Sequence, residues 1–287
     1  MNPHHTLRVA DVRRRFDRAA QGFDDADFVH TVTRDGLFAR LAPAIIDADV
    51  VVDLGCATGS ATPALTKRFR SARIVAIDLS TKMLERCRAK QGWFSKTSIL
   101  QANASALPFA DQSIDVVFAN LLLPWVSEPE QVASEVSRVL RKDGLFVFAT
   151  LGPDSLLEIR NAWATVDDRS HVNRFLDMHD VGDLMLRAGL RDPVLDVDRL
   201  SVSYDNADAL FRDLTAVGAR NSLQDRNSSL VGKQRFEAMR DRLENATADG
   251  GISLDLELVY GHCWGGRAPP AEGDVRIDAA AIPVRRH

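Results

Sequence analysis

The segment Val51-Val52-Asp53-Leu54-Gly55-Cys56-Ala57-Thr58-Gly59 joins a short apolar run to a turn that contains two glycines. A run of this length is typical of a buried strand, and helical spacing resumes near residues 60–70. Glycine lets the backbone approach a ligand closely, and the N-terminus of a helix presents unpaired N–H groups. The segment therefore predicts a strand, a tight turn and a helix that together can bind a ligand.

An acidic residue ends the next predicted strand. Asp78 follows Gly59 by 19 positions and closes the apolar run at residues 73–78. A carboxylate there can accept hydrogen bonds from both ribose hydroxyls of an adenosine ligand. The turn alone could equally be a simple connection, with Asp78 capping the helix that begins after Ser80. The acid at this strand end favours the adenosine site.

The alternation of apolar runs and helical patterns continues along the chain. Strands are predicted at residues 49–54, 73–78, 98–101, 114–119 and 145–150, and helices at 60–70, 81–91, 128–140 and 154–166. Two later runs, near 194–204 and 253–262, show the period-2 pattern of exposed or edge strands. We expect an α/β fold, with a seven-stranded, mostly parallel sheet and helices on both faces.

Several segments lie outside this alternation. Helical spacing predicts two N-terminal helices within residues 7–42. Residues 151–180 and 205–250 follow late strands, so they are expected to form a helical cap over the strand ends. We expect one domain over residues 1–265 and a disordered tail over 266–287.

Composition excludes several classes of protein. The 287-residue chain has 45% hydrophobic residues, 36 basic and 40 acidic side chains, and a net charge of −4. This balance argues against binding to nucleic acid or an anionic membrane through a global positive field. The three cysteines and the histidines lack the spacing of a disulfide framework or a metal site. No apolar stretch reaches membrane-span length and no signal peptide is visible, so a cytoplasmic protein is expected.

The spacing of the first turn distinguishes two classes of nucleotide-binding fold. A dinucleotide fingerprint is G-x-G-x-x-G, whereas Asp53, Gly55 and Gly59 give D-x-G-x-x-x-G. This pattern resembles motif I of the class I S-adenosylmethionine-dependent methyltransferases, which have a Rossmann-like fold. The segment Asn103-Ala104-Ser105-Ala106-Leu107-Pro108-Phe109 resembles their adenine-binding segment, and Ile114-Asp115-Val116-Val117-Phe118-Ala119-Asn120 resembles their fourth-strand motif. Taken singly, Asp115 and Asn120 could be ordinary strand-end residues.

The resemblance implies S-adenosylmethionine as the cofactor and a set of residues that bind it. These residues are Phe23, Asp53, Gly55, Cys56, Ala57, Gly59, Asp78, Leu79, Met83, Asn103, Ala104 and Asn120.

Segments outside the sheet narrow the resemblance to one family. They are Phe16-Asp17-Arg18-Ala19-Ala20 with Phe23-Asp24, Leu151-Gly152-Pro153-Asp154-Ser155-Leu156, His171-Val172-Asn173-Arg174-Phe175, Asp213-Leu214-Thr215-Ala216-Val217-Gly218-Ala219-Arg220-Asn221 and Val259-Tyr260-Gly261-His262-Cys263-Trp264. Together they resemble the BioC family, the malonyl-[acyl-carrier protein] O-methyltransferases of biotin synthesis. The resemblance implies methyl transfer to the free carboxylate of a malonyl thioester carried by acyl-carrier protein or coenzyme A.

A substrate carboxylate needs a group that holds it. A guanidinium does so with two parallel hydrogen bonds, and Arg174 is our first candidate, with Arg160 second. Arg174 could instead form a surface ion pair with Asp177 or Asp180, and Arg160 could lie on an exposed helix face.

Three departures from the family pattern bear on activity. Ala57 stands where many relatives have glycine, Phe23 replaces a tyrosine, and Pro124 replaces a glutamine beside Trp125. Trp125 could line the methyl-transfer pocket or belong to the core. The basic residues Arg212, Arg220, Lys233 and Arg235 could form a docking patch for an acidic carrier or a solvated helix face.

Two other functions remain open at this point. Mitochondrial complex I assembly proteins that resemble BioC act as arginine hydroxylases, and the retained Asn173-Arg174 pair favours BioC over that group. A cofactor-binding scaffold without turnover is the third possibility, because of the three departures.

Overall fold

The computed structural model describes residues 7–92, 95–219, 232–246 and 251–266. The strands are β1 (Val50–Leu54), β2 (Arg73–Asp78), β3 (Ser98–Gln101), β4 (Ile114–Asn120), β5 (Leu140–Leu151), β6 (Arg191–Tyr204) and β7 (Ile252–Trp264). The α-helices are α1 (Val9–Ala19), α2 (Phe28–Leu41), α3 (Thr62–Arg68), α4 (Thr81–Lys90), α5 (Pro129–Val139), α6 (Leu157–Ala164), α7 (Met178–Arg187), α8 (Ala207–Ala216) and α9 (Lys233–Glu244). Two 3₁₀ turns, η2 (Phe23–Asp25) and η3 (Leu123–Trp125), complete the described elements.

The strands form one sheet in the order β3-β2-β1-β4-β5-β7-β6. Strands β1 to β5 pair in parallel, whereas β7 pairs antiparallel with both β5 and β6. The predicted seven-stranded, mostly parallel sheet is confirmed. Two exposed or edge strands were predicted: β6 lies at the edge of the sheet, whereas β7 lies between β5 and β6 and alternates exposed and buried residues only in its first half. The exposed look of β7 comes from its far half, which extends beyond β5.

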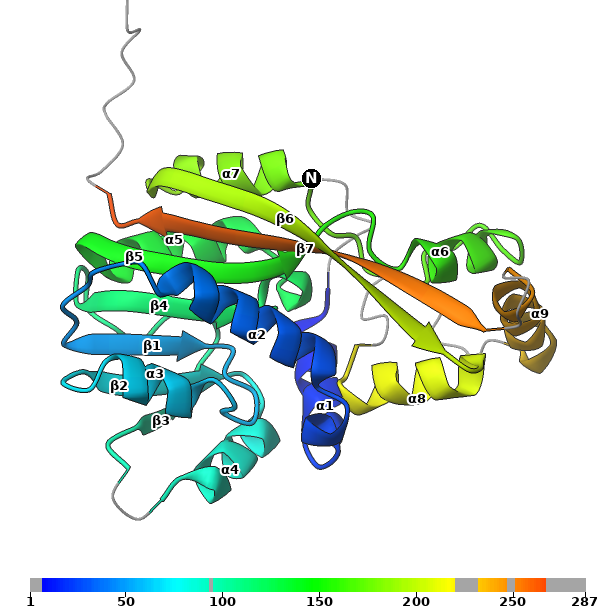
Figure 1. Ribbon diagram of the computed structural model, residues 1–287, viewed down its shortest axis with the longest axis horizontal. Coiled ribbons are helices and arrows are strands. Elements are labelled where there is room, and N and C mark those ends of the chain that lie inside the picture. Colours follow the sequence, from blue (N-terminus) through cyan, green and yellow to red (C-terminus); the bar gives the residue numbers. More distant parts are fainter. Residues whose placement is uncertain (1–6, 93–94, 220–231, 247–250, 267–287) are drawn as a thin grey trace, which may run out of the picture.

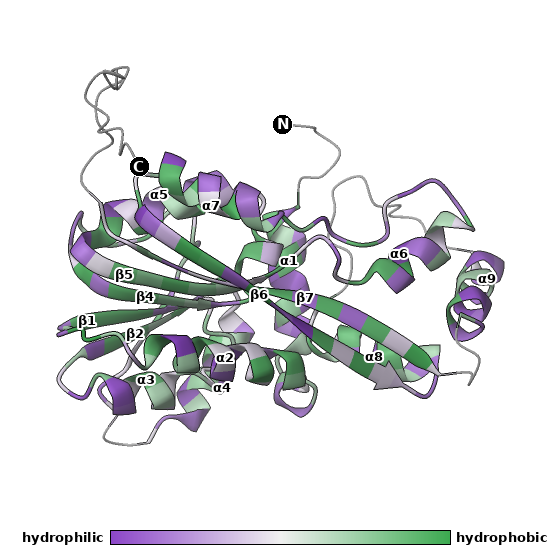
Figure 2. Cartoon of the chain, turned by 45° about the horizontal axis from the view of Figure 1, so that its top comes forward, coloured by the Kyte–Doolittle hydropathy of each residue, from purple (hydrophilic) through white to green (hydrophobic). Residues whose placement is uncertain are grey.

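Helices cover both faces of the sheet (Figure 2), with α2, α3 and α4 on one side and α5 and α7 on the other. Adjacent strand residues point to opposite faces, so Val51 packs in one core with Leu65 of α3, whereas Val52 packs in another with Val136 of α5 and Leu184 of α7. Continuous apolar strands are expected where a parallel sheet is covered on both sides.

The helix α7 was not predicted. Its segment was expected to belong partly to the cap, but Val181, Leu184 and Met185 are buried against the sheet at helical spacing. The side chain of Asp177 caps the helix by accepting a hydrogen bond from the backbone N–H of His179 at 2.7 Å. The spacing of these three buried residues is the signal by which the sequence indicates this helix.

A group of three helices lies beyond the carboxyl end of β5 (Figure 1). Strand β7 pairs with β5 only over Leu258–Trp264, so the remaining half of the β6–β7 ribbon projects past the sheet. Helix α6 packs on β7 and α8 packs on β6, while α9 packs on both of these helices. These elements fall within the two segments expected to form a cap, while most of the expected tail, residues 267–287, lies outside the described residues.

The described residues provide neither a membrane-spanning helix nor a cluster of metal ligands. None of the helices in the described part of the chain combines the length and apolarity that crossing a membrane requires. Among the same residues, no group of three or more His, Cys, Asp and Glu side chains could hold a metal ion.

Candidate active site

The carboxyl ends of β1, β2 and β4 meet at one edge of the sheet. The chain proceeds outward from β1 in both directions, through β2 and β3 on one side and β4 and β5 on the other. In open α/β sheets, ligands bind in the crevice at such a topological switch point. A cavity of about 570 Å³ lies there, and we call it the first cavity.

The turn after β1 has the backbone conformation that its sequence predicts. Gly55 and Gly59 have φ values of +75° and +79°, a region in which glycine is favoured. Ala57 also lies in the left-handed region, with φ of 47°. An L-residue there costs roughly 1–2 kcal/mol, so the turn accommodates the Cβ of Ala57 at the expense of strain.

Asp78 fastens the end of β2 to this turn. Its carboxylate accepts hydrogen bonds from the backbone N–H groups of Ala57 at 2.9 Å and Ser80 at 2.7 Å, and it lines the first cavity. Burial raises the pKa of Asp78 to about 6, against the lowering effect of these hydrogen bonds. Above that pH the carboxylate is ionised and can accept further hydrogen bonds from a ligand in the cavity.

Asp53 has a different environment, although it lies close to the same turn. Its side chain is buried, and the hydroxyl of Thr62 donates to it at 3.0 Å. Burial raises the pKa of Asp53 to about 7, which the hydrogen bond from Thr62 opposes. Asp53 does not line the first cavity, so it supports the turn from behind.

The structure divides the predicted cofactor-binding residues into two groups. The first cavity is lined by Phe23, Gly55, Ala57, Asp78, Leu79, Asn103, Ala104 and Asn120. Asp53, Cys56, Gly59 and Met83 are not among its lining residues. Gly59 has a packing role, since a Cβ there would lie 2.5 Å from the Sγ of Cys87. The roles of all twelve residues in binding remain predictions.

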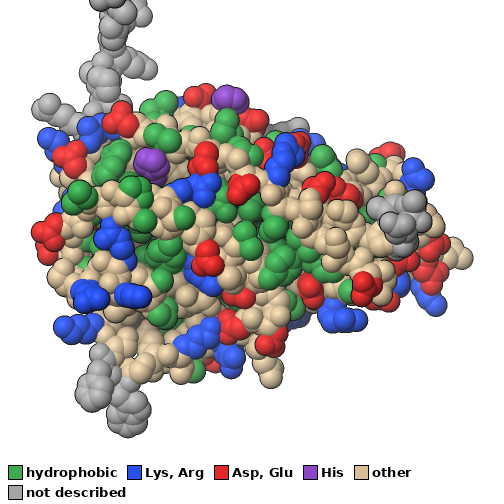
Figure 3. Space-filling model, viewed as in Figure 1, with side chains coloured by type: hydrophobic (Ala, Val, Ile, Leu, Met, Phe, Trp, Pro, Cys, Tyr) green, Lys and Arg blue, Asp and Glu red, His purple; other side chains and the backbone are tan. Residues whose placement is uncertain are grey.

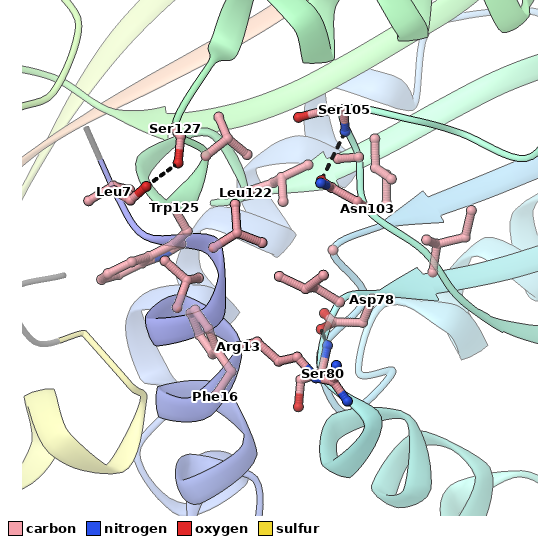
Figure 4. Close-up of a pocket in the computed structure, with 18 of the residues that line it drawn as sticks. Leu7, Arg13, Phe16, Asp78, Ser80, Asn103, Ser105, Leu122, Trp125 and Ser127 are labelled. Carbon is pink, nitrogen blue, oxygen red and sulfur yellow. Dashed lines mark hydrogen bonds between the residues drawn. The ribbon is translucent and has the colours of Figure 1, made fainter. Parts of the chain in front are cut away.

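The N-terminal segment forms a wall of the cavity that sequence reasoning missed. Leu7, Arg13 and Phe16 line the first cavity, and Figure 4 shows them facing the strand ends that carry Asp78. The backbone carbonyl of Leu7 accepts a hydrogen bond from the hydroxyl of Ser127 at 2.6 Å. The amphipathic pattern of α1 was the available signal, but it does not reveal which surface the helix covers.

Two aspartates attach the N-terminal segment to the strand-end turns. Asp17 of α1 accepts hydrogen bonds from the hydroxyl of Ser80 at 2.6 Å and the backbone N–H of Lys82 at 3.2 Å. Asp24 of η2 accepts a hydrogen bond from the hydroxyl of Thr58, in the turn after β1, at 2.5 Å and pairs with Lys90 at the end of α4 at 2.7 Å. Both aspartates belong to the N-terminal segments that resemble the family. Their hydrogen bonds and ion pair hold α1 and η2 over the first cavity.

Two asparagines, Asn103 and Asn120, lie beside strand ends on opposite sides of the first cavity. Asn103 follows β3, and its side-chain oxygen accepts a hydrogen bond from the backbone N–H of Ser105 at 3.1 Å (Figure 4). Asn120 ends β4 and donates from Nδ2 to the backbone carbonyl of His30 at 2.9 Å. Asp115 lies at the opposite end of β4, where it accepts from the backbone N–H of Val50 and binds Arg141, so its role there is structural.

A second cavity of about 390 Å³ lies between the sheet and the three outlying helices. Its lining is rich in aromatic side chains and includes Phe175, Tyr204, Phe211 and Phe236. The rings of Trp163 and His171 stack on each other in its wall with centroids 3.7 Å apart. This cavity is suited to an apolar or extended ligand.

The two cavities share three lining residues, His30, Leu121 and Trp125. We call this place the junction. Trp125 was predicted to line a methyl-transfer pocket or the core, and the structure places it in the walls of both cavities. Sequence reasoning did not single out His30, because a histidine at the start of a helix carries no pattern of its own.

The predicted clamp residues lie beside the second cavity. Arg174 is exposed, and its neighbours Asn173 and Phe175 line the cavity, whereas neither Arg174 nor Arg160 is a lining residue. Arg160 donates to the backbone carbonyl of Pro153 at 3.2 Å. Burial lowers the pKa of Arg160, and the positive charge of Arg174 acts in the same direction. Two guanidinium groups therefore lie near each other outside the cavity wall.

The predicted docking patch is described in part. Arg212 is exposed on α8, and Lys233 and Arg235 are exposed on α9, which packs against α8. Arg220 lies outside the described residues. On the face shown in Figure 3, basic and acidic side chains are interspersed, so a charged partner would meet local groups of charges there.

Comparisons with known proteins agree with this geometry. Residues 52–148 match a family model described as a methyltransferase domain. In structure, the chain is similar to the YcgJ protein of Bacillus subtilis (TM-score 0.57, 17% identity, 81% of this chain and 98% of that one). It is also similar to phosphoethanolamine N-methyltransferase 2 of Haemonchus contortus, solved with S-adenosyl-L-methionine (TM-score 0.55, 13% identity, 88% of this chain and 57% of that one). These likenesses support the Rossmann-like methyltransferase fold.

Similarity in sequence identifies the family more specifically than similarity in structure does. The chain is 39% identical to the malonyl-[acyl-carrier protein] O-methyltransferase of Halorhodospira halophila, over 96% of this chain and 95% of that protein. It is 42% identical to the protein of the same name from Laribacter hongkongensis, over 90% of each chain. The chain therefore belongs to the malonyl-[acyl-carrier protein] O-methyltransferase family.

Proposed function

We propose that this chain transfers a methyl group from S-adenosylmethionine to the free carboxylate of a malonyl thioester, the step that the BioC family performs for biotin synthesis. The observation that carries the proposal is the meeting of two cavities at one junction. The first cavity has the carboxylate of Asp78 at a strand end, where it can accept hydrogen bonds from the ribose of an adenosine ligand. The second cavity has a largely apolar lining. Membership of the family supports the same reaction.

The residues at the strand ends would hold the cofactor. Asp78 would accept hydrogen bonds from the ribose hydroxyls, and Gly55 and Ala57 of the turn would contact the rest of the ligand. Asn103 and Ala104 line the side of the cavity where an adenine would lie. When bound, S-adenosylmethionine supplies an electrophilic methyl group.

The reaction needs positioning more than proton transfer. A carboxyl group with an ordinary pKa of about 4 is already ionised at neutral pH, so the site needs no general base. The largely apolar lining of the second cavity would keep water from a bound acceptor, and alignment of the carboxylate behind the methyl group would lower the barrier. The negative carboxylate and the positive sulfonium neutralise each other as the transition state forms, so a site that buries both charges favours the transition state.

Arg174 and Arg160 are proposed to attract and hold the anionic end of the substrate. Their support is the proximity of two guanidinium groups beside the second cavity. Arg212, Lys233 and Arg235 are proposed to contact an acidic carrier protein through local charges.

The decisive experiment is a transfer assay with labelled S-adenosylmethionine. We expect the purified protein to label malonyl-acyl-carrier protein, and not acetyl-acyl-carrier protein, which lacks the free carboxylate. A parallel assay with malonyl-coenzyme A tests which thioester is used. Calorimetric binding of S-adenosylmethionine without any transfer would instead identify a non-catalytic scaffold.

A cellular test addresses the pathway. Expression of the chain should restore growth without biotin to a bacterial strain that lacks its own malonyl-carrier methyltransferase. A chain that binds S-adenosylmethionine but does not restore growth or label the malonyl carrier would contradict the proposed function.

A further inference from the structure

His30 occupies the junction at which the methyl group and the acceptor would meet. It lies in the first turn of α2, and its side chain lines both cavities. Of the other two junction residues, Leu121 has no polar side-chain atom, and the ring of Trp125 packs edge-on against Phe16 with centroids 5.4 Å apart. Trp125 has a single ring N–H, whereas the imidazole of His30 has two ring nitrogens, one of which can donate while the other accepts.

The ring of His30 is held in place while one of its nitrogens lacks a partner. Its ring packs edge-on against Phe23, with centroids 4.9 Å apart, and its backbone carbonyl accepts the hydrogen bond from Asn120. Nδ1 is buried, and no hydrogen-bond partner for it is found among the residues that the structure describes. An unsatisfied buried polar atom costs about 1–3 kcal/mol. Because Nδ1 is enclosed by protein, the ring nitrogen that a ligand at the junction can reach is Nε2, for which no hydrogen bond is found among the described residues.

The charge of His30 suits a site for a nucleophilic carboxylate. Burial lowers the pKa of His30 to about 4, and the nearby positive charge of Arg34 acts in the same direction. The imidazole is therefore neutral at physiological pH and carries one N–H group. A neutral N–H donor can orient one carboxylate oxygen at the junction, in addition to the attraction that Arg174 and Arg160 are proposed to exert on the anion.

We propose that His30 holds the substrate carboxylate at the junction, by donating a hydrogen bond from its imidazole to one carboxylate oxygen; this rests on the proposed function. The other oxygen forms the new bond to the methyl carbon of S-adenosylmethionine. The bond between that carbon and sulfur breaks, and its electron pair stays on sulfur. The products are the methyl ester and S-adenosylhomocysteine, and the proton of His30 stays on the imidazole.

Two variants separate the hydrogen bond from the packing of the ring. His30→Phe keeps an aromatic ring against Phe23 but has no donor. We expect its rate of transfer to malonyl-acyl-carrier protein to fall about ten- to hundredfold, because a hydrogen bond to a charged group is lost. Its affinity for S-adenosylmethionine, measured by calorimetry, should stay within about twofold of the wild-type value. His30→Gln keeps an N–H donor and should recover part of the lost rate.

Binding in the presence of S-adenosylhomocysteine gives a measurement that a purely structural role would not change. The wild-type protein should bind malonyl-acyl-carrier protein more tightly than acetyl-acyl-carrier protein, and His30→Phe should lose most of that preference. A general disturbance of the site would weaken both equally and would overturn the inference. If His30→Phe does not fold, His30→Leu replaces it, and His179→Gln, at an exposed position on α7, is the control.

The results of these experiments separate a failure of the proposed role of His30 from a failure of the proposed methyl transfer. Wild-type protein that fails to methylate malonyl-acyl-carrier protein would remove both. Normal wild-type transfer, with an unchanged rate and an unchanged preference in the folded donor-free variant, would overturn the role of His30 alone.

Discussion

The two cavities are built in different ways. The first is formed mainly by residues at the ends of neighbouring strands, fixed by hydrogen bonds such as those from Ala57 and Ser80 to Asp78. The second is formed by side chains from segments that are far apart in sequence, and aromatic packing dominates its wall. The comparison indicates that the strand-end part of the first cavity depends on short sequence motifs, whereas the second cavity depends on how distant segments pack. Variants in one cavity should therefore leave the other intact.

The largest expected effect concerns the first cavity. Asp78→Ala removes the carboxylate proposed to accept two ribose hydrogen bonds, each worth about 1.5–3 kcal/mol because the acceptor is charged. We expect the affinity for S-adenosylmethionine to fall by about a hundredfold or more in calorimetry. Asp198→Ala, at an exposed position on β6, is the matched control. An Asp78→Ala protein that is folded and binds with normal affinity would contradict the assignment of the first cavity.

The second expected effect concerns the acceptor side. Arg174→Ala should lower methyl transfer to malonyl-acyl-carrier protein by about ten- to hundredfold, because a charge-assisted contact with the substrate is lost. The affinity for S-adenosylmethionine should not change. Arg187→Ala, at an exposed position near the end of α7, is the control. Transfer at the normal rate in Arg174→Ala would show that the carboxylate is held without this guanidinium.

The third prediction uses pH to test the first cavity alone. Asp78 has a raised pKa of about 6 in the ligand-free protein, so its carboxyl is protonated below that pH. Since ribose hydroxyls donate to the ionised form, affinity for S-adenosylmethionine should be constant above pH 6 and fall about tenfold per unit below it. The free energy of unfolding of the ligand-free protein depends on pH in the opposite direction. A carboxyl whose pKa is raised in the folded state contributes stability at low pH, and this contribution is lost as the pH rises through about 6.

Asp78→Asn is the control for this pH dependence. It removes the titrating group, so its weakened affinity should not follow the same slope. A wild-type affinity that does not change between pH 4.5 and 7 would show that protonation of Asp78 does not oppose binding.

The smallest expected effect is on stability. Ala57→Gly relieves the left-handed backbone conformation at φ of 47° and should stabilise the protein by about 1 kcal/mol, or raise Tm by roughly 2–4 °C. Ala42→Gly is the control, because exposed Ala42 has a right-handed φ of −55° and gains nothing from glycine. Scanning calorimetry of the ligand-free variants checks both. A loss of stability in Ala57→Gly would show that the strain at residue 57 is compensated by its Cβ contacts.

Much of the fold could be predicted because its signals are local. The strand β1, its glycine turn and Asp78 lie close together in sequence, and buried parallel strands are apolar throughout. The errors have local causes as well. Half of β7 extends beyond β5, so its alternating pattern predicted an edge strand, although its other half lies inside the sheet. The helix α7 was missed because a loop with strong family motifs precedes it.

The candidate site could be predicted only in part. Eight of the twelve predicted cofactor-binding residues line the first cavity: Phe23 lies in η2, and the other seven lie at strand ends or in the segments that follow them. Leu7, Arg13 and Phe16 were missed, because an amphipathic helix shows that one face is buried but not what buries it. His30 was missed for a similar reason, since its importance depends on the Asn120 side chain and on two cavities.

The sequence by itself determined the parallel sheet, the turn after Leu54 and the acid that faces it, because each depends on residues that are neighbours along the chain or on a short repeating period. Only the tertiary structure decided that α1 covers the first cavity, that α6, α8 and α9 enclose the second, and that the two meet at His30. These features depend on contacts between distant segments. Their free energy comes from burial and shape complementarity, which no local pattern records.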